Sequence, residues 1–220
     1  MRRAVVFDCD GVLVDSERLA APILAELLSE LGLPTTPQDV DRDFKGRSWE
    51  HGLTVIRARR GDEPIWPQLR ERYRAALFAA FDAQLAPIPG VVAALDALDA
   101  AGVPYCVASS GDHERIRRGL RAAGLLDRFP DASIFSVEDV ARGKPAPDLF
   151  LHAAAAMGFD PARTVVVEDS PAGVQAGVAA GMLVLGYAGA DDADALRAAG
   201  AQPFESMAAL PALLGVGTPR

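Results

Sequence analysis

The sequence predicts an α/β fold: a Rossmann-like, three-layer core built on a parallel sheet and interrupted by an inserted all-helical cap domain. From residue 88 onward, strand-like apolar runs alternate with helix-like segments, a pattern typical of parallel sheets covered by helices. The run at residues 4–7 is apolar on both faces and must join the same sheet. Residues 16–86 contain no clear strand run. We therefore expect residues 1–15 and 87–220 to form the core and residues 16–86 to form the cap.

The inserted segment shows helical periodicity near both of its ends. A first helix is expected over residues 16–31, where leucine and isoleucine recur every four residues and Gly32 follows. A second helix is expected over residues 66–85. The segment is therefore expected to contribute helices and no strand to the fold.

The core elements follow one another in regular alternation. Helices are expected from about residue 91 and over residues 112–123 and 148–157, each followed by a glycine, and from Pro171. Strands are expected at residues 105–108, 134–135, 164–167 and 182–185, the last of them being the final strand of the chain. Right-handed crossovers between these strands would give a parallel sheet with helices on both faces.

Composition and charge exclude several classes of function. The net charge is 22 − 30 = −8, which argues against non-specific binding of nucleic acid or of an anionic membrane. Only four apolar residues lie between Arg3 and Asp8, too few for a signal peptide, and no apolar stretch reaches the roughly 20 residues of a membrane span. Cys9 and Cys106 are expected to be buried, reduced thiols. We expect a soluble cytoplasmic protein, either a monomer or a small homo-oligomer.

Two acids stand directly after the first strand-like run. Asp8 and Asp10 follow it, and open α/β sheets bind their ligands at the carboxyl ends of strands. Carboxylate oxygens suit Mg²⁺, and the metal offsets the repulsion between an acid and an anionic substrate. The pair alone is also typical of a polar turn, so the interpretation depends on further motifs.

Three further motifs lie after later strand-like runs. Ser109 and Ser110 end the second run, where a hydroxyl and backbone N–H groups can hold phosphate oxygens. Lys144 precedes a proline and can act as a point charge for phosphate. Glu168 and Asp169 end the run that begins at residue 164, and two adjacent acids repel unless a cation lies near them. Together the motifs predict a site for a cation and a phosphate.

With these motifs in order, the chain resembles the haloacid dehalogenase-like hydrolase superfamily over nearly its whole length. The first motif is residues 7–17, the second is Ser109, the third Lys144 and the fourth Glu168-Asp169. The stretches at residues 143–148 and 168–173 resemble the branch that contains β-phosphoglucomutases and small sugar-phosphate phosphatases. The resemblance implies a helical cap between the first and second motifs, which closes over the site.

The resemblance also implies a role for each site residue. Asp8 would attack phosphorus and form an aspartyl-phosphate, with Asp10 as general acid and base. Asp8, the carbonyl of Asp10 and Asp169 would hold Mg²⁺, and Glu168 would act through water or through a neighbour. Ser109, Lys144 and the N–H groups of Asp10, Gly11 and Ser110 would surround the transferred phosphoryl group. In the cap, Lys45, Gly46 and Arg47 resemble the substrate-binding loop of this branch, although a surface turn is the alternative.

These features favour a Mg²⁺-dependent phosphatase that acts on a small phosphorylated metabolite such as a sugar phosphate. A β-phosphoglucomutase is the alternative within the family, but those mutases carry a histidine at the position of Ala20. Dehalogenases lack the second acid, so Asp10 argues against them. A non-enzymatic phospho-receiver is a third hypothesis, which the helical insert and Asp10 disfavour. The sequence does not identify the substrate.

Overall fold

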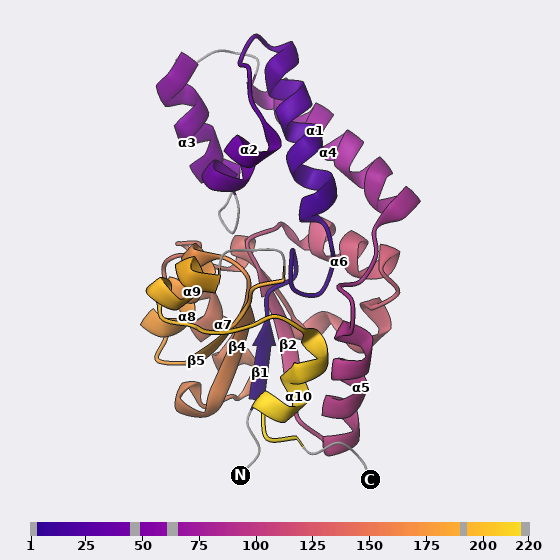
Figure 1. The fold of residues 1–220 in the computed structure, drawn as a ribbon, viewed down its shortest axis with the longest axis vertical. Helices are drawn as coiled ribbons and strands as arrows, with labels where there is room; N and C mark the ends of the chain where they lie inside the picture. Colours follow the sequence, from indigo (N-terminus) through magenta and orange to yellow (C-terminus); the bar gives the residue numbers. More distant parts are fainter. Residues whose placement is uncertain (1–3, 45–48, 61–65, 190–192, 217–220) are drawn as a thin grey trace.

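A computed structural model describes residues 4–44, 49–60, 66–189 and 193–216 (Figure 1). Within this part of the chain a parallel sheet has the strand order β3-β2-β1-β4-β5-β6. The strands are β1 (Ala4–Phe7), β2 (Tyr105–Ser109), β3 (Ile134–Ser136), β4 (Thr164–Glu168), β5 (Leu183–Tyr187) and β6 (Gln202–Phe204). The α/β class with a Rossmann-like parallel sheet is therefore confirmed.

The sheet is buried on both faces, because apolar side chains of each strand point alternately into two cores. Val5 and Phe7 of β1 pack into the core under α5 (Val91–Ala101) and α6 (His113–Ala122). Val6 packs into the opposite core, with α7 (Asp148–Met157), α8 (Pro171–Ala179) and α9 (Ala193–Ala199). The short helix α10 (Leu210–Leu213) packs on α5. These layers explain why the central strands have no polar face.

One strand was not expected from the sequence. The prediction that the strand near residue 185 is the last of the chain is wrong, because β6 follows it and pairs with β5 in parallel. β6 has only three residues and contains Pro203, a residue that signals a turn and cannot donate a ladder hydrogen bond. The strand lies at the edge of the sheet, the place where proline is tolerated.

Among the described residues between β1 and α5 there are four helices. They are α1 (Glu17–Glu30), α2 (Pro37–Phe44), α3 (Trp49–Arg60) and α4 (Trp66–Gln84). Figure 1 shows them beyond the end of the sheet to which the strand arrows point. α4 packs on α6 of the core, and Arg74 bonds Asp112 at 2.7 Å across that contact. The division into a core and a cap domain at residues 15/16 and 86/87 remains a proposal.

The two segments that connect these helices to the sheet are bonded to each other. The N–H of Asp15 donates to the carbonyl of Ala86 at 2.9 Å, and the N–H of Ile88 donates to Leu13 at 3.0 Å. Val14 and Pro87 form an antiparallel bridge between these bonds. The outgoing and returning connections therefore run side by side as one short two-stranded ribbon.

Candidate active site

The site lies where the strand order of the sheet reverses. β1 has β2 on one side and β4 on the other, and Phe7 is in register with Val107 and with Val167. The residues that follow these positions therefore meet at one edge of the sheet. Such a reversal leaves a crevice outside the carboxyl ends of the strands, where open α/β sheets bind ligands.

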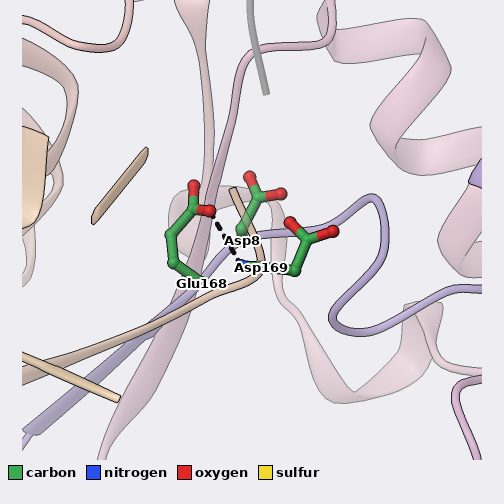
Figure 2. A group of neighbouring side chains, drawn as sticks. All are labelled: Asp8, Glu168 and Asp169. Carbon is green, nitrogen blue, oxygen red and sulfur yellow. Dashed lines mark hydrogen bonds between the residues drawn. The ribbon is translucent and has the colours of Figure 1, made fainter. Parts of the chain in front are cut away.

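Three carboxylates gather in this crevice. Asp8, Glu168 and Asp169 are 5%, 0% and 3% exposed, and one oxygen of each lies within 4.8 Å of the others. Figure 2 shows the three carboxylates around a common space, with the N–H of Asp169 bonded to Glu168. Buried like charges at this spacing repel strongly, so the group needs cations to be stable in its ionised form.

Lys144 supplies one of those cations. Its ammonium donates to Asp8 Oδ1 at 2.6 Å, to Glu168 Oε1 at 2.7 Å and to the carbonyl of Ala108 at 3.1 Å. All three protons of the ammonium therefore have an acceptor. Burial lowers the pKa of Lys144, but the charges of Asp8 and Glu168 outweigh that effect and raise it overall. The lysine therefore stays charged between the two carboxylates.

Glu168 is held in place by the start of α8. Its Oε2 accepts bonds of 2.9 Å from the N–H of Asp169 and from the N–H and hydroxyl of Ser170. The same hydroxyl caps α8 by accepting the N–H of Gly173 at 3.1 Å. Glu168 therefore has protein donors on both oxygens, an arrangement that fits a positioning role better than direct binding of a ligand.

Burial and the charge of Lys144 have opposing effects on the pKa of Asp8. Burial raises its pKa well above the usual range, Lys144 opposes this, and the charges of Glu168 and Asp169 raise it further. A divalent cation beside Asp8 and Asp169 would favour the ionised form that a nucleophile requires. The oxygen-only donor set is the kind that Mg²⁺ takes in proteins.

The turn after β1 brings Gly11 against Asp169. Gly11 has φ +77°, and a Cβ on it would lie 2.1 Å from Asp169 Oδ2, so only glycine fits there. Its N–H donates to the carbonyl of Val14 at 2.9 Å in this structure, whereas a bond to the phosphoryl group was expected from the sequence. What Gly11 contributes here is the close approach of the turn to the acid.

Asp10 lies apart from the carboxylate group, on the wall toward the helices α1–α4. Its Oδ1 accepts the hydroxyl of Ser16 at 2.5 Å and lies 3.1 Å from an Nη of Arg115. The sequence did not point to Arg115, because the residue belongs to no motif. Its position in the first turn of the helix that follows Ser109 was the one available signal.

Ser109 ends β2 and Ser110 begins the turn that follows it. The Ser109 hydroxyl accepts the N–H of Gly111 at 3.1 Å, which fixes the turn after β2. Both serines line a cavity of about 340 Å³ together with Asp8 and Asp10. The structure thus brings together Asp8, Asp10, Ser109, Ser110, Lys144, Glu168 and Asp169 at one end of the sheet. The predicted residues Lys45, Gly46 and Arg47 lie outside the described residues.

The helices α1–α4 form the other wall of this cavity, and most of their contribution is apolar. The lining residues from this side include Leu24, Phe44, Trp49, Tyr73, Leu77 and Phe78. The part of a substrate that points away from the serines would therefore lie against these side chains. Within the described residues no helix is both long and apolar enough to cross a bilayer.

Comparisons with known proteins agree with this geometry. The chain is 36% identical to the 6-phosphogluconate phosphatase of Escherichia coli (strain K12), over 82% of this chain and 80% of that protein. It is 33% identical to hexitol phosphatase A of the same strain, over 83% and 82% of the two chains.

A solved structure and a family model extend the match. A haloacid dehalogenase family hydrolase from Deinococcus radiodurans R1, crystallised with bound phosphate and sodium, is 35% identical with a TM-score of 0.77, covering 100% of this chain and 99% of that one. These relatives confirm the prediction of an enzyme of the phosphatase class. The family model of haloacid dehalogenase-like hydrolases matches residues 2–181, and the chain belongs to that family.

Proposed function

We propose that this protein is a Mg²⁺-dependent phosphatase that hydrolyses a small phosphorylated sugar or sugar acid through an aspartyl-phosphate on Asp8. The observation that carries the proposal is the position of Lys144, whose ammonium bonds Asp8 and Glu168 at 2.6 and 2.7 Å. It fixes Oδ1 of Asp8 and leaves Oδ2 as the attacking atom. Cytoplasmic location and a monomeric or small homo-oligomeric state are part of the proposal.

The carboxylate group would hold the metal. Asp8, Asp169 and the backbone carbonyl of Asp10 are the expected ligands, and Glu168 acts through Lys144 and bound water. When bound, Mg²⁺ supplies positive charge that offsets the phosphoryl oxygens and the carboxylates.

The chain's own residues then carry the reaction. Oδ2 of Asp8 forms a bond to phosphorus while the ester P–O bond breaks, and Asp10 gives a proton to the departing oxygen. Asp10 next takes a proton from water, the water oxygen bonds to phosphorus, and the Asp8 carboxylate leaves. Ser109 and the N–H of Ser110 donate to the phosphoryl oxygens, with Lys144 fixing the nucleophile.

The substrate class follows from the cavity and from the relatives. The cavity that the serines line is about 340 Å³ and is bounded on its other side by α1–α4, which suits a small metabolite. Two relatives are named for phosphorylated sugar acids or hexitols. Lys45 or Arg47 would hold a second polar or anionic group of such a substrate.

A β-phosphoglucomutase is the alternative within the family. Mutases of this branch carry a histidine where this chain has Ala20, and Ala20 lines the cavity on α1. No imidazole is therefore available at that position to bind Asp10 or the sugar, which favours hydrolysis.

A panel of esters tests the proposal. The panel contains 6-phosphogluconate, sorbitol 6-phosphate, glucose 6-phosphate, phosphoglycolate and p-nitrophenyl phosphate, and inorganic phosphate is measured. We expect release from at least one sugar ester, abolished by EDTA and restored by Mg²⁺, and none from Asp8→Asn. Phosphate release by Asp8→Asn at the wild-type rate would overturn the nucleophile. Conversion of β-glucose 1-phosphate to glucose 6-phosphate without free phosphate would favour the mutase.

A further inference from the structure

Arg115 binds the residue proposed as acid and base. An Nη of Arg115 lies 3.1 Å from Asp10 Oδ1, and the Ser16 hydroxyl donates to the same oxygen at 2.5 Å. Oδ1 is thus held by one ion pair and one hydrogen bond, which leaves Oδ2 of Asp10 for proton transfer. The arginine side chain is 23% exposed, so its bond with Asp10 is shielded from most of the solvent.

The inserted helices hold Arg115 from the other side. Tyr73 of α4 is 8% exposed and lies beside the guanidinium: burial raises the pKa of Tyr73, and the charge of Arg115 opposes that rise. The guanidinium carbon also lies 6.0 Å from the ring centre of Phe81, on the same helix. Arg115 therefore joins a residue of the core turn to residues of α4, which is far from it in sequence.

The contacts continue from Tyr73 toward the segment expected to bind substrate. Tyr73 stacks on Trp49 with ring centres 5.4 Å apart and an angle of 16°, and Trp49 contacts Phe44 at 6.2 Å. Phe44 and Trp49 directly flank residues 45–48 in the sequence. A shift of these helices relative to the core would therefore disturb Tyr73, and through it Arg115 and Asp10.

We propose that Arg115 is a positioning residue for Asp10, and that Tyr73 fixes Arg115, so that the acid and base is oriented only when the inserted helices are seated on the core. This inference rests on the proposed role of Asp10. The structural basis of the inference is the planar guanidinium of Arg115, which reaches Asp10 and Tyr73 at once. The compact ammonium of a lysine does this less well. The planar fork also explains why an arginine stands at this place.

Arg118 provides a matched control. It lies one turn further along α6 and pairs with Asp82 of α4, with its guanidinium 4.8 Å from the ring centre of Phe78. It therefore contributes to the same contact between α4 and α6 without reaching Asp10. A purely structural role for Arg115 predicts equal effects of Arg115→Met and Arg118→Met.

The first measurement compares two esters by kcat/KM. 6-Phosphogluconate has an alkyl leaving group that needs a proton from Asp10, whereas the nitrophenolate of p-nitrophenyl phosphate leaves without one. Arg115→Met should lose about 10- to 100-fold on 6-phosphogluconate and several-fold less on p-nitrophenyl phosphate. Arg118→Met should lose little on either ester. Arg115→Lys should lose less kcat/KM on 6-phosphogluconate than Arg115→Met does. Tyr73→Phe should also lose less, and its loss should again be greater on 6-phosphogluconate than on p-nitrophenyl phosphate.

The second measurement is a double-mutant cycle with Asp10→Asn. If Arg115 acts through Asp10, adding Arg115→Met to Asp10→Asn should cost less than about twofold further on 6-phosphogluconate. Fully additive losses, or a rise in KM for 6-phosphogluconate with kcat unchanged, would overturn the inference. Equal losses of activity in Arg115→Met and Arg118→Met, with an active wild type, would overturn this inference and leave the proposed function standing. A wild type that releases phosphate from none of the esters of the panel would overturn the proposed function as well.

Discussion

Gly173 and Glu168 are in direct contact, so closely that no side chain fits between them. A Cβ built on Gly173 would lie 1.7 Å from Glu168 Oε1 and 1.9 Å from its carboxyl carbon. The backbone of α8 thus forms one wall of the pocket that holds the glutamate. Because Glu168 in turn holds Lys144 at 2.7 Å, the glycine also determines where the lysine lies.

Gly173→Ala should therefore impair both folding and activity. The added methyl must displace Glu168, which has no space to move because the residue is fully buried. We expect a loss of about 1–3 kcal/mol in the free energy of unfolding and a larger proportional loss of phosphatase activity. Urea unfolding and phosphate release measure the two effects. Val178→Ala is the control, since Val178 is 46% exposed on the same helix.

Lys144→Met should destabilise the protein strongly. It removes the ammonium between Asp8 and Glu168, whose side chains are 7% and 0% exposed, and leaves two buried carboxylates unbalanced. The expected cost is about 3–5 kcal/mol in urea unfolding without metal. Adding Glu168→Gln should restore part of that stability, because one of the two charges is gone. A double variant less stable than Lys144→Met would contradict the charge argument.

The metal-free protein should become less stable relative to Asp8→Asn as the pH rises. Burial raises the pKa of Asp8 in the folded state, and the nearby carboxylates add to the effect. A group with a raised pKa stabilises the fold fully below its unfolded pKa of about 3.9 and loses that contribution as the pH rises through the folded value. Melting temperatures of both proteins in EDTA, measured from about pH 4 upward, test this difference.

Mg²⁺ should reverse that difference. A metal that binds the folded state alone raises the melting temperature, and the rise grows with the ratio of free metal to its dissociation constant. The rise should be larger for the wild type than for Asp8→Asn, because the amide is a weaker ligand for Mg²⁺ than a carboxylate. An equal rise in both proteins would show that Asp8 does not bind the metal.

The two cysteines should be unreactive in the folded protein. Cys9 and Cys106 are 2% and 0% exposed, and burial raises the pKa of Cys106 to about 12. The thiolate that reacts with dithionitrobenzoate is therefore both scarce and inaccessible at neutral pH. We expect no colour from native protein and the reaction of two thiols in guanidinium chloride. Rapid labelling of the native protein would contradict the burial of these two side chains.

Patterns within short stretches of the sequence predicted most of the strands of the sheet and the helices that cover it. The helix α7 begins at Asp148 and ends at Met157 as expected, and Gly158 closes it with φ +68°. Such caps and apolar runs are local, so a sequence shows them directly. The short edge strand β6 was missed because three residues with a proline carry no strand signal of their own.

The candidate site likewise contains residues that local sequence patterns predict and one residue that they do not. Asp8, Ser109, Glu168 and Asp169 follow strand-like runs, and the reversal of strand order brings them together as expected. Arg115 could not be found in this way. Its importance arises from a contact between α6 and α4, which depends on how the inserted helices pack and leaves no pattern in the sequence.

The ribbon formed by the two connecting segments restricts how the inserted helices can move. The bonds between Asp15 and Ala86 and between Ile88 and Leu13 tie both crossings into a single pivot. Two crossings held together in this way favour a swing of the inserted helices about the ribbon over a slide along the sheet.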